Sequence, residues 1–262
     1  MLMKKQMPIF VHFYIALVVC CLNSNVYAET VRVYVETPSV LVDEEGRSLG
    51  ISVFKAMEKV SDLRFKFTRS TYSRALLNLK KDKADVVLHL PYGVEPGFDE
   101  YGIYLDWSVP VKADLYAVDP KSFKNLSEIG DKQIGIPRGN AKFASKLTGI
   151  PQEKFYEVDT MNSLIKMLAA KRVDLIWFDR VAVRQALKQY NVSNIYYYEY
   201  PKLGKQGSIG VGLQNTERGR RLKKVIDELI PLIDVDTILA PYYKHLQPDL
   251  PATGKVNLGG AG

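Results

Sequence analysis

Two rounds of alternating strand and helix patterns run along this chain and constrain its fold more than any other feature. Short runs of β-branched and aromatic residues predict strands, and amphipathic stretches predict helices. The predicted strands cover residues 31–36, 63–68, 84–90, 113–118, 133–136, 154–158, 173–178, 195–200 and 208–213. The predicted helices cover residues 49–60, 72–81, 141–147, 162–171, 181–190, 218–233 and 237–245. This order favours the α/β class, with mainly parallel sheets flanked by helices on both faces.

The repetition of this order predicts two lobes. If the chain leaves the first lobe along 113–118 and returns along 208–213, that lobe is discontinuous and the two crossings form a two-segment hinge. We expect lobe 1 to comprise residues 29–115 plus 212–246, and lobe 2 residues 116–211. Residues 247–262 are rich in Gly and Pro and have no periodicity, so they are expected to form a flexible tail.

Residues 1–28 have the layout of a cleavable signal peptide. Lys4 and Lys5 precede an apolar stretch at 9–22, and cleavage is expected after Ala28. A membrane anchor is the first alternative, but the stretch is shorter than the ~20 residues that a span needs. A lipid-anchored cysteine is the second, and the residue preceding each cysteine fits it poorly. The rest of the chain is therefore expected to be exported to the periplasm.

The cysteines and the charge exclude several classes of protein. Cys20 and Cys21 both lie in the leader, so neither a disulfide scaffold nor a cysteine-based zinc site is expected, and no cofactor or metal is indicated. The formal net charge is +7, and the densest basic run, 218–224, fits the solvated face of an amphipathic helix. Nucleic acid is therefore not an expected partner.

Five segments, in this order along the chain, resemble the extracellular solute-binding proteins of family 3. The first is an opening strand with a proline turn and an acidic-Gly hairpin (Val33–Gly50), and the second is a helix end (Leu76–Asp85, with Asp82 where glycine is usual). The third is a Ser-Pro crossover (Trp107–Pro110), the fourth a strand with a Gly turn (Ile134–Leu147), and the fifth a strand that ends in aspartate (Leu168–Asp179).

The resemblance implies a type II periplasmic binding protein of the polar amino-acid ABC transporter type. Such a protein captures a small polar or charged, amino-acid-like ligand in the cleft between its lobes, without catalysis. It implies an inner-membrane permease or receptor as partner, and we expect a monomer.

Asp179 is the first candidate for ligand contact. It ends a predicted parallel strand, and ligands bind at the carboxyl edge of such sheets. The resemblance implies that its carboxylate holds the amino group of a ligand. The alternative is a helix N-cap, a position that aspartate favours, and one side chain can serve both roles.

The turn Arg138-Gly139-Asn140 precedes a predicted helix. Backbone N–H groups at a helix start can bind an anion, and the corresponding turn of the family receives a carboxylate. Arg138 is expected either to add a bidentate clamp or to face solvent.

Tyr72 and Arg74 open a predicted helix of lobe 1. Tyr72 can offer a stacking face or a hydroxyl to a ligand. Arg74 lies at the helix end that disfavours cations, which favours a place in the cleft over an ordinary surface position.

The chain departs from the family in residues 89–106. This stretch contains Tyr92, a further candidate, but no Arg or Lys, where the family carries the arginine that grips the α-carboxylate of its ligand. Either Arg74 or Arg138 takes over, or the ligand lacks that carboxylate. Glu36 and the acidic loop would suit a cationic or polyol ligand, or would simply be solvated; the acidic loop residues are Glu95, Asp99 and Glu100.

Two other functions remain open. Some proteins of this fold resemble cyclohexadienyl dehydratases; here Glu36 or Glu95 would act as general acid and Arg74 and Arg138 would hold carboxylates. The chain could also be a free-standing sensor that docks on a receptor when occupied.

Overall fold

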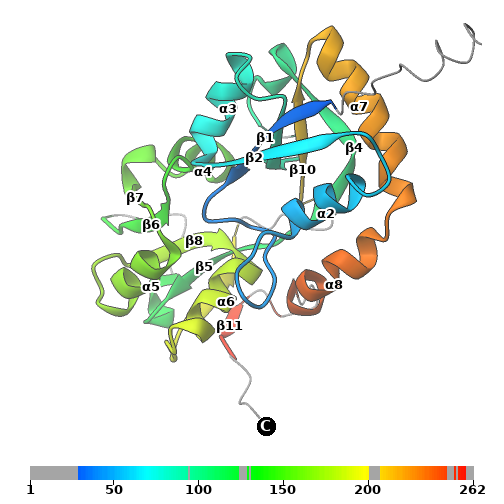
Figure 1. The fold of residues 1–262 in the computed structure, drawn as a ribbon. Coiled ribbons are helices and arrows are strands. Elements are labelled where there is room, and N and C mark those ends of the chain that lie inside the picture. The colour runs from blue at the N-terminus through cyan, green and yellow to red at the C-terminus, as the bar shows by residue number, and fades with distance from the viewer. Residues whose placement is uncertain are drawn as a thin grey trace, which may run out of the picture.

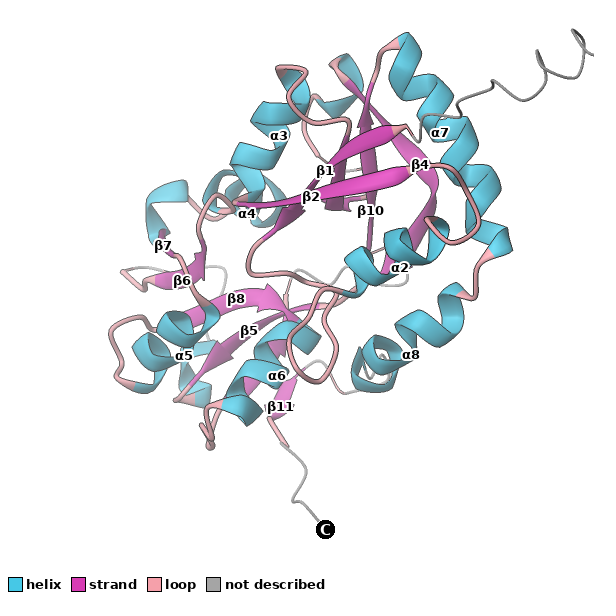
Figure 2. Ribbon diagram, viewed as in Figure 1, coloured by secondary structure: helices cyan, strands magenta, loops and turns pink. Residues whose placement is uncertain are grey.

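The fold is that of a computed structural model, which describes residues 29–93, 95–123, 129, 131–200, 207–246, 251 and 253–257. The expected signal peptide, residues 1–28, lies outside the described residues. Two sheets, each with helices on both faces, form two lobes (Figures 1 and 2), as the strand and helix patterns predict. No helix among the described residues is both long and apolar enough to cross a membrane.

The first sheet has the order β2-β1-β3-β10-β4. Its strands are β1 (Thr30–Glu36), β2 (Arg64–Ser70), β3 (Val86–Pro91), β4 (Gly102–Pro110) and β10 (Ser208–Gln214). β1 pairs in parallel with β2 and β3, whereas β10 runs antiparallel to both β3 and β4. The return strand β10 therefore lies inside the first sheet.

Three helices cover this sheet: α2 (Leu49–Met57), α3 (Tyr72–Lys80) and α7 (Glu217–Leu229). Because successive strand residues point to opposite faces, Val33 packs in the cluster that contains α2 and α7, and Tyr34 packs in the cluster of α3. The alternation of β1 thus supplies both faces of lobe 1 with apolar contacts.

The second sheet has the order β11-β9-β5-β8-β6-β7. Its strands are β5 (Ala113–Ala117), β6 (Ile134–Pro137), β7 (Phe155–Val158), β8 (Leu175–Asp179), β9 (Tyr196–Glu199) and β11 (Thr253–Lys255). Its helices are α4 (Ala141–Thr148), α5 (Met161–Ala169) and α6 (Arg180–Gln189). α5 and α6 cover one face, and α4 packs in the cluster on the other.

The two expected crossings lie side by side. The chain leaves the first sheet after β4 and enters the second at β5, and the Val111 N–H donates to the Gly207 carbonyl of the returning segment at 3.0 Å. β5 belongs wholly to the second sheet and β10 wholly to the first. The crossings therefore fall a few residues from the expected limits at 115/116 and 211/212.

Two strands were not expected from the sequence. β4 falls in a connecting region of the sequence pattern; it is an edge strand, with Leu105 and Val109 buried and Asp106 exposed. β11 pairs antiparallel with β9 and buries Val256, so residues 253–257 are not part of a flexible tail. Its short polar sequence, TGK, carries no strand signal. The strand forms because β9 supplies its hydrogen-bond partners.

Helix α8 (Val235–Leu246) and β11 make a third connection between the lobes that the two-segment hinge did not include. α8 packs against α2 of the first lobe and α6 of the second (Figure 1), and the chain then continues to β11 in the second sheet. Its buried residues include Leu239 and Tyr242.

Candidate functional site

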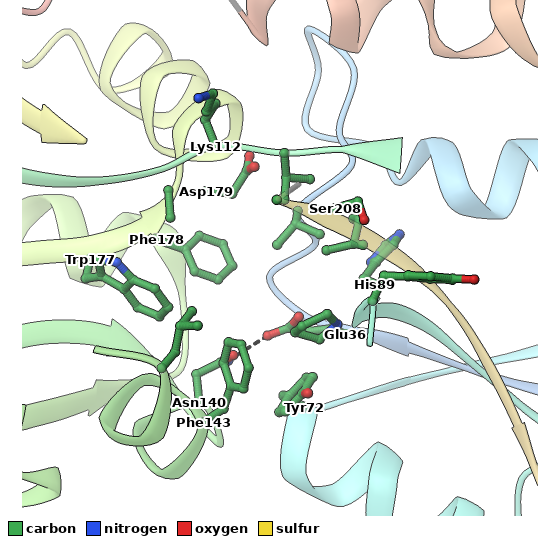
Figure 3. Close-up of a pocket in the computed structure, with 18 residues that line it drawn as sticks. Glu36, Tyr72, His89, Lys112, Asn140, Phe143, Trp177, Phe178, Asp179 and Ser208 are labelled. Atoms are coloured by element: carbon green, nitrogen blue, oxygen red, sulfur yellow. Dashed lines mark hydrogen bonds between the residues drawn. The ribbon is translucent and has the colours of Figure 1, made fainter. Parts of the chain in front are cut away.

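A cavity of about 350 Å³ lies between the lobes. Strand ends and loops of both sheets line it, as expected for a ligand site at the carboxyl edge of parallel strands. Figure 3 draws its lining residues: Glu36, Val40, Tyr72, His89, Pro91, Tyr92, Val111, Lys112, Ala113, Asn140, Phe143, Leu147, Trp177, Phe178, Asp179, Gly207, Ser208 and Ile209.

Two buried carboxyl groups reach this cavity from opposite lobes (Figure 3). Glu36 is the last residue of β1 and is 3% exposed; Asp179 is the last residue of β8 and is 6% exposed. The Asn140 amide donates to Glu36 Oε1 at 2.6 Å. Asp179 accepts from the Ala182 N–H at 2.9 Å, the expected N-cap bond, and from the Tyr242 hydroxyl at 3.1 Å.

Burial keeps both carboxyl groups prone to protonation. Desolvation raises the pKa of Glu36 to about 7, against the Asn140 hydrogen bond, and the negative charge of Asp179 raises it further. Desolvation likewise raises the pKa of Asp179 to about 7, although its bonds from Ala182 and Tyr242 oppose this. Among the described residues, therefore, neither group has a cationic partner that would stabilise its ionised form.

Aromatic rings form much of the remaining wall. Trp177 and Phe178 precede Asp179 on β8, and Phe143 comes from α4. Tyr72 faces them from lobe 1, with its ring centroid 5.7 Å from that of Phe143. The Trp177 indole N–H donates to the Tyr200 carbonyl at 2.6 Å, so the polar edge of that ring is already bonded and its apolar surface lines the cavity.

Among the described lining residues, Lys112 is the only lysine or arginine, and it has a partner. Its ammonium lies 2.8 Å from Glu199 Oε1 and points away from the centre of the cavity (Figure 3). His89 is buried, and desolvation lowers its pKa to about 3, so its ring is neutral. The described part of the cavity lining therefore contains two carboxyl groups without a cationic partner and one ammonium group that is already paired with Glu199.

A buried ion network forms around Arg180, the residue after Asp179 in the chain. Arg180 makes a bidentate pair with Asp114, with both distances at 2.8 Å, and its Nη2 lies 2.9 Å from Glu199. Arg180 and Asp114 are fully buried. The sequence patterns did not predict this network. The signal for it was Asp114 inside ADLYA, a stretch otherwise typical of a buried strand, because a buried carboxylate requires a cationic partner.

The turn before α4 does not have the anion-binding role that was expected for a ligand. The N–H groups of Gly139 and Ala141 donate to Glu157 Oε1 at 2.9 and 3.2 Å, so a carboxylate of the chain itself occupies the expected anion site. Arg138 is exposed and pairs with Asp159, outside the cavity. Of this turn, only Asn140 lines the cavity.

Of the candidates in lobe 1, some line the cavity and others lie outside it. Tyr72 and Tyr92 line the cavity, whereas Arg74 is exposed on α3 and lies outside it. The Tyr72 hydroxyl donates to Glu95, whose pKa desolvation raises, while Asp99 and Glu100 are exposed. Five of the eight candidates thus meet in the cavity: Glu36, Tyr72, Tyr92, Asn140 and Asp179.

Gly139 marks where the lobes touch. Its φ is +91°, and a Cβ there would lie 2.8 Å from Ser73 Oγ across the cleft. We expect Gly139→Ala to lower the free energy of unfolding by about 1–2 kcal/mol through the left-handed backbone, and to hold the lobes further apart. Small-angle X-ray scattering should show a larger radius of gyration.

Gly149→Ala is the matched control for this change. Its φ is +75° with nothing within 4 Å of a Cβ, so it carries the backbone cost without the contact between lobes. If both variants had the same radius of gyration, the contact at Gly139 would not limit closure.

Comparison with known proteins shows similarity at the level of the fold. No family model and no curated protein sequence matches the chain. The substrate-binding protein of an amino acid ABC transporter matches with a TM-score of 0.65 and 13% identity, over 82% of this chain and 100% of that chain. AbpA, an amino acid ABC transporter substrate-binding protein from Streptococcus pneumoniae bound to L-arginine, matches at 0.65 and 12% identity, over 83% and 96%.

A histidine kinase sensor domain with similarity to periplasmic binding proteins also matches. Its TM-score is 0.64 at 14% identity, over 84% of this chain and 97% of that chain. The chain has the two-lobed fold that these solute-binding and sensor proteins share, as the resemblance in its sequence implied.

Proposed function

We propose that this chain is a solute-binding protein, which captures a small polar or charged solute between its lobes for ABC-type uptake. The observation that supports this most is the cavity itself, since side chains of both sheets line it. A solute that contacts both lobes stabilises the closed arrangement, and closure can report occupancy to a partner.

The leader pattern and the neighbours in structure extend the proposal. Export through residues 1–28 would place the protein in the periplasm, where an inner-membrane permease or receptor can meet it. We further propose that it acts as a monomer, because the lobes of a single chain enclose the cavity.

A dehydratase-like activity has less support. That alternative needs cationic groups to hold the carboxylates of its substrate, and the two expected for this role, Arg74 and Arg138, lie outside the cavity. Glu36 could hold a proton near neutral pH, but Lys112 is paired with Glu199. The geometry favours capture over elimination chemistry.

The proposed function is tested by screening small solutes with a fluorescent reporter in the cavity. The chain has two tryptophans, and Trp107→Phe leaves Trp177, which lines the cavity, as the reporter. We expect at least one solute among amino acids, amines, sugars and organic acids to shift the Trp177 emission and to reduce the radius of gyration. Fluorescence and scattering that no solute in this set changes would contradict the proposal.

A further inference from the structure

We propose that the captured solute is an organic amine, cationic at its nitrogen, with an apolar body and no carboxylate. This inference rests on the proposed function and specifies its ligand. It follows from three features of the cavity: the charges that lack a partner, the charges that already have one, and the walls.

Among the described lining residues, the ionisable groups that lack an oppositely charged partner are two acids, Glu36 and Asp179. The hydrogen-bond donors to Glu36 and Asp179 are neutral: the Asn140 amide for the first, and the Ala182 N–H and the Tyr242 hydroxyl for the second. A buried carboxylate without a cationic partner is strongly disfavoured. An ammonium group that enters the cavity supplies that partner and can donate charge-assisted hydrogen bonds to both lobes at once.

The groups that would receive a carboxylate are already bonded within the chain. The helix-start N–H groups donate to Glu157, Arg138 pairs with Asp159, and Lys112 pairs with Glu199. Residues 89–106 contain no arginine or lysine. The carboxylate of an α-amino acid would therefore enter a desolvated site beside two acidic groups, with no described cation free to meet it.

The walls favour an apolar body next to the ammonium. Phe143, Trp177 and Phe178 present rings from lobe 2, with Tyr72 opposite (Figure 3), and Tyr92 of lobe 1 also lines the cavity. Aromatic faces attract cations and pack against apolar groups, and both effects grow when water is excluded. A polyol could donate hydrogen bonds to Glu36 and Asp179 but, being neutral, would leave both without a cationic partner.

The affinity for an amine should rise with pH. Beside Glu36 the titratable groups are His89 and Tyr72, and Tyr72 bonds Glu95. Beside Asp179 they are Tyr242, Asp114 with its partner Arg180, and Lys112 with its partner Glu199. Burial lowers the pKa of His89 to about 3 and raises the pKa values of Tyr72 and Tyr242 well above their ordinary value of 10, so none of these three groups titrates near neutral pH. Between pH 5.5 and 8 the two acids therefore ionise, and the affinity should rise roughly tenfold or more.

The test uses amines and the amino acids from which they differ by one carboxylate. We expect calorimetric titration of the purified protein to show that 2-phenylethylamine binds at least about tenfold more tightly than L-phenylalanine, and 1,5-diaminopentane more tightly than L-lysine. Glu36→Gln and Asp179→Asn keep the size of each side chain and its capacity to accept hydrogen bonds. Each should weaken binding of the better amine by about tenfold or more.

Arg74→Gln is the matched control, because Arg74 is a charged residue of lobe 1 that lies outside the cavity. It should leave amine binding unchanged. Circular dichroism and thermal melting of each variant separate a lost ligand contact from a lost fold.

The outcomes distinguish this inference from the proposed function. Tighter binding of the amino acids, unchanged amine binding in both Glu36→Gln and Asp179→Asn, or closure on a sugar or organic acid without amine binding would overturn the ligand class and leave solute capture intact. Absence of closure with every solute of the fluorescence screen would overturn both.

Discussion

Arg180→Met is expected to lower the free energy of unfolding by about 3–5 kcal/mol, because it leaves Asp114 buried and without its bidentate partner. Arg180 is fully buried and joins β5, β9 and the start of α6 through Asp114 and Glu199. The loss should appear as an earlier midpoint in chemical denaturation at neutral pH. A loss below about 1 kcal/mol would mean that Asp114 finds another partner or becomes protonated at little cost.

Two further variants test whether the loss of stability comes from the unpaired buried charge. Arg138→Met removes an exposed arginine from the ion pair with Asp159 and should leave the denaturation midpoint unchanged. Combining Arg180→Met with Asp114→Asn removes both charges of the fully buried pair and leaves Glu199 paired with Lys112, so it should recover most of the lost stability. Failure of the combined variant to recover would mean that Arg180 acts through packing and not through charge.

Glu36→Gln is expected to stabilise the ligand-free protein above pH 7, by up to about 3 kcal/mol, and to have little effect at pH 4. The folded pKa of Glu36 is about 7 and its ordinary value is 4.5. The folded state therefore binds the proton more tightly than the unfolded state. Below pH 4.5 the carboxyl is protonated in both states; as the pH rises to 7 it ionises first in the unfolded state, and the free energy of unfolding falls.

Replacing Glu36 by glutamine removes this dependence, so the difference between variant and wild type should grow from pH 4.5 to pH 7 and then level off. Denaturation series at several pH values measure it directly. Glu153→Gln, at an exposed glutamate in lobe 2, should show no such trend. A difference between Glu36→Gln and wild type that stayed constant with pH would contradict the burial of an uncompensated carboxyl at Glu36.

The same property links stability to ligand capture. A cleft that holds two carboxyl groups without a cation is less stable at neutral pH than one in which they are neutral or paired. An entering cation relieves this, so part of the binding energy comes from the correction of an unfavourable empty site. In the Glu36→Gln variant, gain of stability and loss of amine affinity should therefore occur together.

Much of the fold was predictable because it depends on local patterns. Apolar residues at the helical period predicted α5 over 162–171, and the structure has Met161–Ala169; the β-branched run at 31–36 predicted β1. Edge strands were harder to predict. β4 mixes exposed polar with buried apolar residues, and β11 has almost no apolar content, so both depend on the strands they pair with.

The candidate site was predictable where it follows from chain topology. Asp179 ends a parallel strand and Glu36 ends another, so both reach the same edge of their sheets by geometry alone. Trp177 and Phe178 could have been proposed on the same grounds. Arg74 and Arg138 were chosen for their charge, and the charge of a side chain does not reveal whether it points into a cleft or away from it.

The sequence by itself determined the order of strands and helices, the two lobes, and the acidic residues at the strand ends. Hydrophobic periodicity encodes these, since it records which side of each element must leave water. Only the tertiary structure decided which charges are already paired. Glu157 meets the turn of Gly139, and Arg180 meets Asp114 across 66 residues. Such pairs form between groups far apart in the chain, and no local pattern carries that information.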